Sequence, residues 1–418
     1  MKMQFLKIGK LKSFSIYFVA SMVTAVIGLL INPLLATGLS HSDYAIIGYY
    51  SAYGSLLTPI ISFSLQSYYA RNYFLLDLGT REKLLQNIMS VFMTLSIGSF
   101  ILFISVYYLY HKTFVESIPF SPYAILSFAP LYVSSYYNLY LMKLRMESKA
   151  TRYSIITISN SILGALLSVL MVYFLKYGAF GRLVATLIVG ILFSVYSISM
   201  TKFRFQWDWK VIKPAMKFCI PITISGILSF FFIGIDRPML AKLNDNYTLG
   251  LYNVGLQISA YLTIFGTVLL QTFDPDLYKY TSLRQHKKVI FLIIGITLAC
   301  LFPNLCFILV SKPLIGILTA GRYVEASDFA NILCLKNVAT TFAFIMSGVL
   351  IGYGYPSYEL INRSIGSVLS FLIYSYLISN YEFYGAAWGQ SLTWLIMGGI
   401  SCCCLMMIGY AKYRKNKT

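Results

Sequence analysis

One basic residue lies deep inside a long apolar stretch of this chain of 418 residues. Lys336 follows Asp328 by eight residues and precedes 22 uncharged residues, which places it roughly 12 Å into a helix that rises 1.5 Å per residue. A charged group in hydrocarbon costs several kcal/mol, so one that is retained usually faces a cavity or a partner. We therefore predict that Lys336 faces a hydrated cavity, where an ammonium group can bind an anion through charge-assisted hydrogen bonds.

Two arginines are further candidates for the same chemistry, each with an alternative. Arg237 also suits an anchor at the membrane interface. Arg363 also suits an ion pair with Glu359, which precedes it by four residues on the same helix face. Asp236 and Arg237 are neighbours, so on a helix they are expected to point about 100° apart. Asp236, Asp274 and Glu359 are the candidates for ion coupling, and none of them lies clearly at the centre of an apolar stretch.

Three uncharged polar residues, Asn32, Gln66 and Gln271, lie within or near other apolar stretches. Their amides suit the hydroxyls of sugars, but neutral polar groups also pack helices together in membranes. The 35 tyrosines can supply both interfacial belts and surfaces on which sugars stack. Both interpretations of these polar and aromatic residues remain open.

The composition defines the elements that must position these side chains. Hydrophobic residues make up 58% of the chain and charged residues 11%, whereas a soluble domain has about 25% charged residues. This excludes a soluble enzyme. Twelve runs of 18 or more residues contain no Asp, Glu, Lys or Arg, and each is long enough for the roughly 20-residue helix that crosses a bilayer. The runs are residues 13–42, 44–70, 84–111, 117–142, 153–175, 183–201, 218–235, 246–273, 289–311, 337–358, 364–381 and 383–411. We predict an all-α polytopic membrane protein with 12 transmembrane helices.

The basic residues alternate between successive loops. Of the 33 Lys and Arg residues, 24 lie in the N-terminal segment, the even-numbered loops and the C-terminal tail. The opposite loops hold six. Basic residues are retained on the cytoplasmic side, so we predict that both termini are cytoplasmic. The net charge of +19 is spread over short loops and forms no single stripe of the kind that binds nucleic acid. It suits contact with anionic membrane lipids, and no nucleic-acid partner is expected.

Neither the cysteines nor the histidines form a metal site. The seven cysteines lie in predicted spans without the spacing of a metal or disulfide pattern. His41, His111 and His286 lie in three separate loops, which excludes a histidine cluster for a catalytic metal. We expect no metal, no cofactor and no catalytic residue.

A repeated pattern divides the chain into two halves. Residues Leu30–Ala36 match Ile235–Ala241 in having a proline followed by Leu or Met, Leu and Ala. Pro33 and Gln66 are 33 residues apart, and so are Pro238 and Gln271. With six spans in each half, the halves are parallel repeats of the kind found in transporters. We predict two six-helix lobes, residues 1–205 and 206–418, around a central cleft that opens alternately to the two sides of the membrane.

The layout resembles that of the polysaccharide and O-antigen flippases, the Wzx-type members of the superfamily that also contains multidrug exporters and the lipid II flippase. The residues that carry the resemblance are Asn32–Leu35, Leu39–Tyr44, Tyr69–Phe74, Ile235–Arg237 and Leu249–Val254. They look like the family's first two spans with an acidic-Tyr turn, and like its seventh-span Asp-Arg followed by a Gly-x-Tyr start to the eighth. The chain departs from the pattern where isoleucines follow Tyr44 in place of the frequent glycine.

This resemblance implies a function and a location. The expected activity is translocation of an undecaprenyl-diphosphate-linked oligosaccharide, such as an O-antigen repeat unit, across the bacterial inner membrane. The resemblance implies that membrane lipids surround the protein. It also allows other polysaccharide-assembly proteins as partners. The implied contacts for the diphosphate or for acidic sugars are Arg71, Arg237, Lys336 and Arg363. Those for the glycan are Asn32, Gln66 and Gln271.

Two alternatives remain, one from the same superfamily and one from a different class. A cation-coupled multidrug exporter of the same superfamily should need carboxylates in its cleft, yet the first two spans contain no Asp or Glu. A membrane polymerase or ligase for glycans should carry a large outer loop for its catalytic surface. The longest outer loop here, about residues 311–328, is too short to form a domain.

Overall fold

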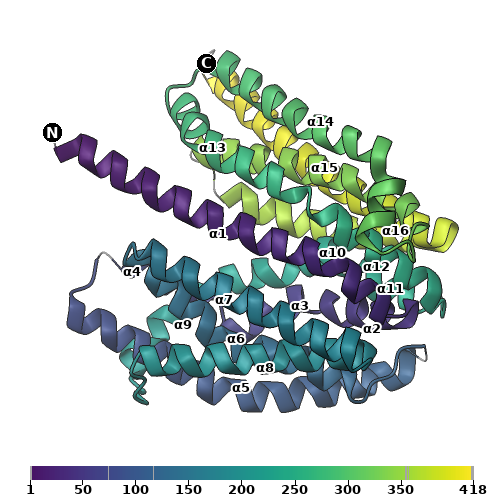
Figure 1. The fold of residues 1–418 in the computed structure, drawn as a ribbon. Helices are drawn as coiled ribbons and strands as arrows, with labels where there is room; N and C mark the ends of the chain where they lie inside the picture. The colour runs from purple at the N-terminus through teal and green to yellow at the C-terminus, as the bar shows by residue number, and fades with distance from the viewer. Residues whose placement is uncertain (1, 74, 116, 354, 356, 416–418) are drawn as a thin grey trace. The chain divides into compact units, whose positions relative to one another are not determined.

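The computed structural model describes residues 2–73, 75–115, 117–353, 355 and 357–415. Within these ranges the side chains of residues 2–15, 96, 97, 114, 271, 272, 274, 275, 278, 282, 357, 359 and 408–415 lie outside the description. Over the described ranges the chain forms α-helices and one π-helical turn, without a strand (Figure 1). The all-α prediction is therefore confirmed for this part of the chain. The contacts divide the chain into two compact units, Met1–Ile227 with Leu318–Ala320, and Leu228–Ile317 with Gly321–Thr418.

The described residues of the first unit form nine helices and the π-helical turn. Helix α1 packs along α7, and α6 packs along α8, while the short helices α2, α3 and α4 contact α6. A buried cluster that includes Leu65, Tyr69, Leu85, Phe92 and Cys219 joins α4, α5 and α9. The elements are α1 (Lys2–Gly38), α2 (His41–Ala52), α3 (Gly54–Ser62), α4 (Leu65–Asn72), α5 (Leu78–Phe114), α6 (Tyr123–Met146), α7 (Ala150–Val169), η1 (Leu170–Phe174), α8 (Gly178–Met200) and α9 (Trp209–Leu228).

The second unit is organised around one long helix, α15, which packs along α12, α13 and α16. Buried residues of α15, including Ile345 and Val349, pack with Leu277 of α13 and Val289 and Ile296 of α14. The elements are α10 (Phe230–Ile233), α11 (Asp236–Ala241), α12 (Asn246–Ala260), α13 (Thr263–Ser282), α14 (His286–Leu318), α15 (Ala326–Gly352) and α16 (Ser357–Lys415).

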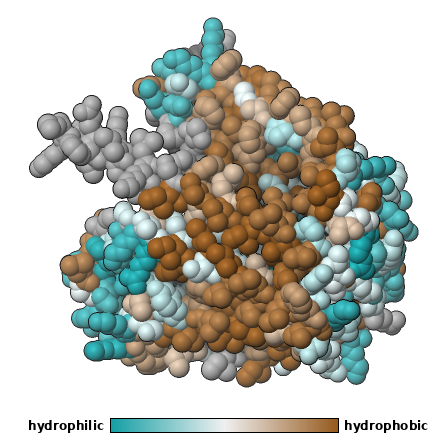
Figure 2. All heavy atoms as spheres, in the orientation of Figure 1, coloured by the Kyte–Doolittle hydropathy of each residue, from teal (hydrophilic) through white to brown (hydrophobic). Residues whose placement is uncertain are grey.

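The surface of the helices is that of a protein in lipid. On α14 the side chains of Phe291, Leu298, Phe302, Leu309 and Ile317 are all exposed. On the face shown in Figure 2, apolar side chains cover the middle of the helices, and hydrophilic residues gather toward the helix ends. Nine helical segments in the described part of the chain are long and apolar enough to cross a membrane. The chain is a multi-pass membrane protein.

Twelve predicted spans become nine segments because one span is broken, two are joined, and the fourth lies in the continuous helix α6, which is not among the nine. The last two predicted spans fall in one segment, Leu360–Met407, in which the helical geometry is interrupted at Glu382 (φ 47°, ψ −125°). The second predicted span is divided among α2, α3 and α4, none of which reaches the length of a span. The number twelve, the six-helix lobes and the boundary after residue 205 stay predictions.

The break between α3 and α4 is held by neighbouring side chains. Phe63 and Ser64 have φ values of 44° and 50°, a left-handed geometry that costs residues other than glycine roughly 1–2 kcal/mol each. The Cys219 thiol donates to the Ser64 carbonyl oxygen at 3.4 Å, and the Thr223 hydroxyl donates to the Ser64 hydroxyl at 3.3 Å. Unwound backbone is tolerated at membrane depth where protein groups satisfy it, and α9 does so here.

The repeated sequence pattern includes matching helix starts. The Ser40 hydroxyl accepts a hydrogen bond from the Asp43 backbone N–H and caps α2, while the Asp245 carboxylate accepts from the Thr248 N–H and caps α12. Each cap satisfies backbone donors that a helix N-terminus leaves without partners. Both caps come seven residues after the repeated prolines at positions 33 and 238.

Candidate functional site

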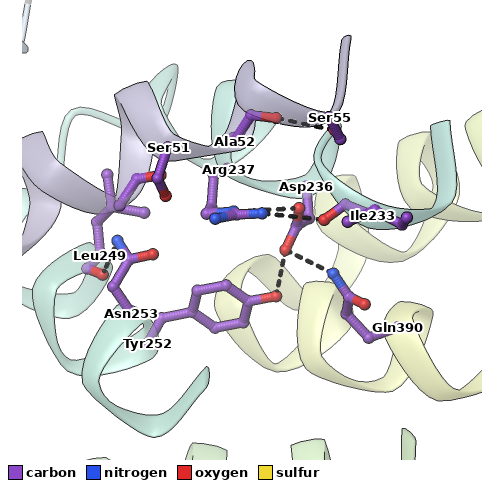
Figure 3. Close-up of polar contacts among 11 residues, drawn as sticks. Ser51, Ala52, Ser55, Ile233, Asp236, Arg237, Leu249, Tyr252, Asn253 and Gln390 are labelled. Carbon is purple, nitrogen blue, oxygen red and sulfur yellow. Dashed lines mark hydrogen bonds and ion pairs between the residues drawn. The ribbon is translucent and has the colours of Figure 1, made fainter. Parts of the chain in front are cut away.

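The Asp236 carboxylate in α11 is the centre of a buried polar cluster in the second unit (Figure 3). Asp236 is 0% exposed. Its Oδ2 accepts hydrogen bonds from the Tyr252 hydroxyl of α12 at 2.6 Å and from Nε2 of Gln390 in α16 at 2.9 Å. Its Oδ1 lies 3.6 Å from Nε of Arg237. One carboxylate thus connects α11, α12 and α16.

Arg237 is the ion-pair partner of this carboxylate and is itself buried. Its Nη2 donates to the Ile233 carbonyl oxygen at 2.9 Å. The two side chains meet although neighbours on a helix are expected to point about 100° apart, and the long arginine side chain also reaches the preceding turn of the chain. Removing one partner of such a buried ion pair strongly destabilises the protein, because the other charge is then left unpaired in a dry site.

Lys336 on α15 belongs to the same charged neighbourhood. The charges of Asp236 and Arg237 both act on its ammonium group. Its side chain is partly exposed, while the next residue, Asn337, is buried and donates to the Ser259 carbonyl oxygen at 2.9 Å. Within the described part of the chain, no hydrogen bond or ion pair is made by the Lys336 ammonium. With one carboxylate and two cations, the cluster has a net charge of +1 when Lys336 is protonated.

Arg363 on α16 lines a small cavity next to this cluster. The cavity has a volume of about 80 Å³, and Asn362 and Ser229 also line it. Nη1 of Arg363 donates to the Ser229 hydroxyl at 3.2 Å. Ile233, whose carbonyl oxygen accepts from Arg237, lines the same cavity. Three of the four predicted cations therefore lie in adjoining parts of the second unit.

The remaining predicted contacts with described side chains lie in the first unit. Arg71 is in the last turn of α4, is exposed, and has its guanidinium 4.4 Å from the centre of the Phe218 ring. Gln66 is partly buried in the first turn of α4, directly after the left-handed break. Asn32 is 2% exposed within α1. These residues belong to a different compact unit from the charged cluster.

The other predicted residues fall outside the description. The side chains of Gln271 and Asp274 in α13 and of Glu359 in α16 are not among the described residues. Their proposed roles in glycan binding and in ion coupling, and the pairing of Glu359 with Arg363, stay predictions.

Sequence reasoning missed the groups that hold the charges. Tyr252 and Gln390 bind Asp236 directly, and Tyr374, which is also buried, lies within the electrostatic influence of Asp236. Tyr252 is part of the Gly-x-Tyr segment that follows α11, which is a weak signal. Gln390 is a single amide in a long uncharged run, and by sequence alone such a residue is more easily explained by helix packing.

The arrangement suits the binding of anions and offers little to a metal. Within the described residues, no group of three or more His, Cys, Asp or Glu could hold a metal ion. The cationic groups of Arg237, Lys336 and Arg363 lie in a mostly apolar unit, where the low dielectric strengthens their attraction for a negative charge.

The comparisons with known proteins agree with this description. The model of a family described as polysaccharide biosynthesis protein matches residues 79–328. The chain is 24% identical over 379 residues to protein 1 of the Lsg locus of Haemophilus influenzae, and the match covers 86% of this chain and 88% of that protein.

Two solved structures share the fold over most of their length. The lipid II flippase MurJ in an inward closed conformation matches with a TM-score of 0.71 at 14% identity, over 93% of this chain and 87% of that one. A multidrug-resistance MATE transporter of the MOP superfamily in an inward-facing conformation matches with a TM-score of 0.67 at 15% identity, over 93% and 96%. The resemblance predicted from the sequence is confirmed: the chain has the MOP-superfamily fold and belongs to the polysaccharide biosynthesis protein family.

Proposed function

We propose that the protein is a flippase for an undecaprenyl-diphosphate-linked oligosaccharide, such as an O-antigen or related repeat unit. It moves this lipid from the cytoplasmic to the periplasmic leaflet of the bacterial inner membrane by alternating access. Both termini are cytoplasmic, and two parallel lobes, residues 1–205 and 206–418, rock about a cleft. Membrane lipids surround it, and other polysaccharide-assembly proteins are candidate partners.

The excess of positive charge around Asp236 is the observation that carries this proposal. A diphosphate has at least two negative charges and cannot cross hydrocarbon unaided. Arg237 and Lys336 can replace its water with charge-assisted hydrogen bonds. Lys336 has no ion-pair partner within the described residues, so its ammonium is the group that we assign to the substrate.

Asp236 has a supporting part in this mechanism. Its carboxylate holds Arg237 and is itself held by Tyr252 and Gln390. We propose that Asp236 limits the affinity for the anionic substrate, because a site that bound one state too tightly would not release on the other side. Of the three candidates for ion coupling, Asp236 is the one whose side chain is described.

Deleting the gene and restoring it on a plasmid tests the proposal. The expected result is that deletion removes surface polysaccharide and causes lipid-linked repeat units to accumulate on the inner leaflet, and that the plasmid reverses both effects. A deletion strain with unchanged surface glycan would contradict the proposal.

The two alternatives give different results in the same strains. A multidrug exporter would change the sensitivity of the cells to cationic drugs and leave surface glycan intact. A polymerase or ligase would leave single repeat units on the outer leaflet, where they are accessible to an added lectin in spheroplasts.

A further inference from the structure

A cavity of the first unit is larger than the cavity that Arg363 lines beside the charged cluster. It has a volume of about 520 Å³, which lies in the range of roughly 300–1,000 Å³ typical of small-molecule sites. It is lined by residues of α1, α6, α7 and α8 and is partly open to its surroundings. None of the residues assigned above to the diphosphate or to the glycan lines it.

The lining has an uncommon chemistry for a membrane-embedded space. Arg182 of α8 is the single charged residue among the described residues that line it. Nη1 of Arg182 donates to the Ser168 hydroxyl, which fixes one edge of the guanidinium. Among the described lining residues there is no carboxylate, so this lining does not favour a cation. An arginine in this position favours a carboxylate, which can accept two parallel hydrogen bonds from the planar group.

Amides and hydroxyls line the rest of the polar wall. The side chains of Asn138 on α6 and Asn160 on α7 are partly buried, and within the described residues neither amide takes part in a hydrogen bond. A polar group left without a partner in such a site is costly, so a hydroxyl-rich occupant is favoured. An acyl chain of a lipid would leave both amides without partners.

One wall of the cavity is aromatic. The rings of Tyr137 and Phe193 pack edge to face with 5.8 Å between their centres, and both residues line the cavity. Aromatic faces suit the apolar faces of pyranose rings, while the tyrosine hydroxyl remains a hydrogen-bonding group.

We propose that this cavity binds one acidic sugar residue, a hexuronic acid or a sugar with a similar carboxylate, with its carboxylate on Arg182 and its hydroxyls on Asn138 and Asn160. This rests on the proposed function, because the sugar is part of the glycan that the flippase carries. The first unit then selects the glycan, and the cationic cluster of the second unit binds the diphosphate.

Saturation-transfer NMR on the full chain in lipid nanodiscs tests the site directly. The probes are methyl glucuronide and the neutral methyl glucoside. The expected result is binding of the glucuronide in the millimolar range and at least tenfold weaker binding of the glucoside, the loss expected for one charge-assisted hydrogen bond. Equal transfer to both glycosides, or transfer to neither because a lipid chain fills the cavity, overturns the proposal.

Variants identify the cavity as the place of binding. Arg182→Gln and Asn160→Leu, on two different helices, are each expected to weaken glucuronide binding about tenfold, and Arg182→Lys is expected to recover part of it. Arg152→Gln is the matched control, because Arg152 is an exposed arginine on α7 that does not line the cavity. Binding that survives both cavity variants but is lost in Lys336→Ala contradicts the inference, because the sugar then binds the second unit.

The failure of this inference and the failure of the proposed function give different patterns. If the gene deletion abolishes surface glycan but Arg182→Gln binds glucuronide as the wild type does, the flippase stands and the sugar site does not. If the cavity variants lose binding while the deletion strain keeps normal surface glycan, the sugar site stands and the proposed function is wrong.

Discussion

Helices α1 to α4 of the first unit and α10 to α13 of the second share a sequence pattern but differ in what they carry. A proline, a helix cap seven residues later and a glutamine 33 residues later recur in both. The positions before the proline are Ile31 and Asn32 in the first unit and Asp236 and Arg237 in the second. The charges are therefore specific to the second copy.

The two copies also differ in where the backbone is interrupted. The first copy has two consecutive left-handed residues between α3 and α4, while the corresponding part of the second copy lies inside the continuous helix α13. At the positions before the proline the first copy has the uncharged residues Ile31 and Asn32, whereas the second copy has the charged residues Asp236 and Arg237. The difference teaches that duplicated segments can keep the same helix starts and acquire separate chemistry.

The largest effect is expected at Lys336. Lys336→Ala should abolish transport, because it removes the one described cation of the cluster that has no ion-pair partner, and Lys336→Arg should retain part of it. The measurement is surface polysaccharide at matched protein abundance. Lys312→Ala is the control, because Lys312 is exposed on α14. Normal export by Lys336→Ala would show that Lys336 does not bind the substrate. It would also show that transport does not depend on the positive charge of the second unit at this position.

The next effect concerns the stability of the second unit alone. Asp236→Ala should destabilise the protein by about 3–5 kcal/mol, the cost of breaking a buried ion pair, and it also removes the acceptor for Tyr252 and Gln390. Limited proteolysis in mixed micelles should show early cleavage within α10 to α16 and slower cleavage of the first unit. Asp328→Ala, at an exposed position of α15, is the control. Equally faster cleavage of both units would show that the carboxylate does not stabilise the second unit alone.

A smaller pair of effects tests whether the repeat is structural. Ser40→Ala and Asp245→Ala each remove one helix cap, and each should cost about 1 kcal/mol of unfolding free energy. Denaturant titration of the two variants should give similar losses. If one cap variant is neutral while the other loses the full amount, the two helix starts are not equivalent.

The smallest expected effect concerns the backbone break between α3 and α4, which the second copy of the repeat lacks. Ser64→Gly should stabilise the first unit by up to about 1 kcal/mol, because glycine adopts the left-handed conformation without a steric penalty. Leu269, which is 205 residues later in the repeat, lies inside α13, and Leu269→Gly should destabilise the protein. Unfolding midpoints of the two variants should move in opposite directions, and a shift of the same sign in both would argue against the left-handed break.

Part of this site was predictable from the sequence, because charge is rare in apolar runs. Arg237, Lys336 and Arg363 stand out for that reason, and they lie in adjoining parts of one unit. Their convergence with Asp236 was not predictable, since it depends on how an arginine side chain turns back in a short helix. Tyr252 and Gln390 were missed because a single hydroxyl or amide in a membrane helix has many uses.

The fold was predictable at the level of class and less so at the level of individual spans. Charge-free runs indicate helices that cross the membrane, but they do not indicate where such a helix is interrupted. The break at Phe63 and Ser64 involves no glycine, and the groups that satisfy it, Cys219 and Thr223, come more than 150 residues later. Only tertiary contact supplies the reason for that break.

The attachment of Asp236 to α11, α12 and α16 restricts how the second unit can deform. Sliding any of these helices by one turn would separate the carboxylate from the Tyr252 hydroxyl or from the Gln390 amide. The carboxylate would then lack hydrogen-bond donors in a dry interior, which is costly. Internal rearrangement is therefore energetically opposed at this depth, and a transport cycle would preserve the relative positions of these three helices from one end state to the other.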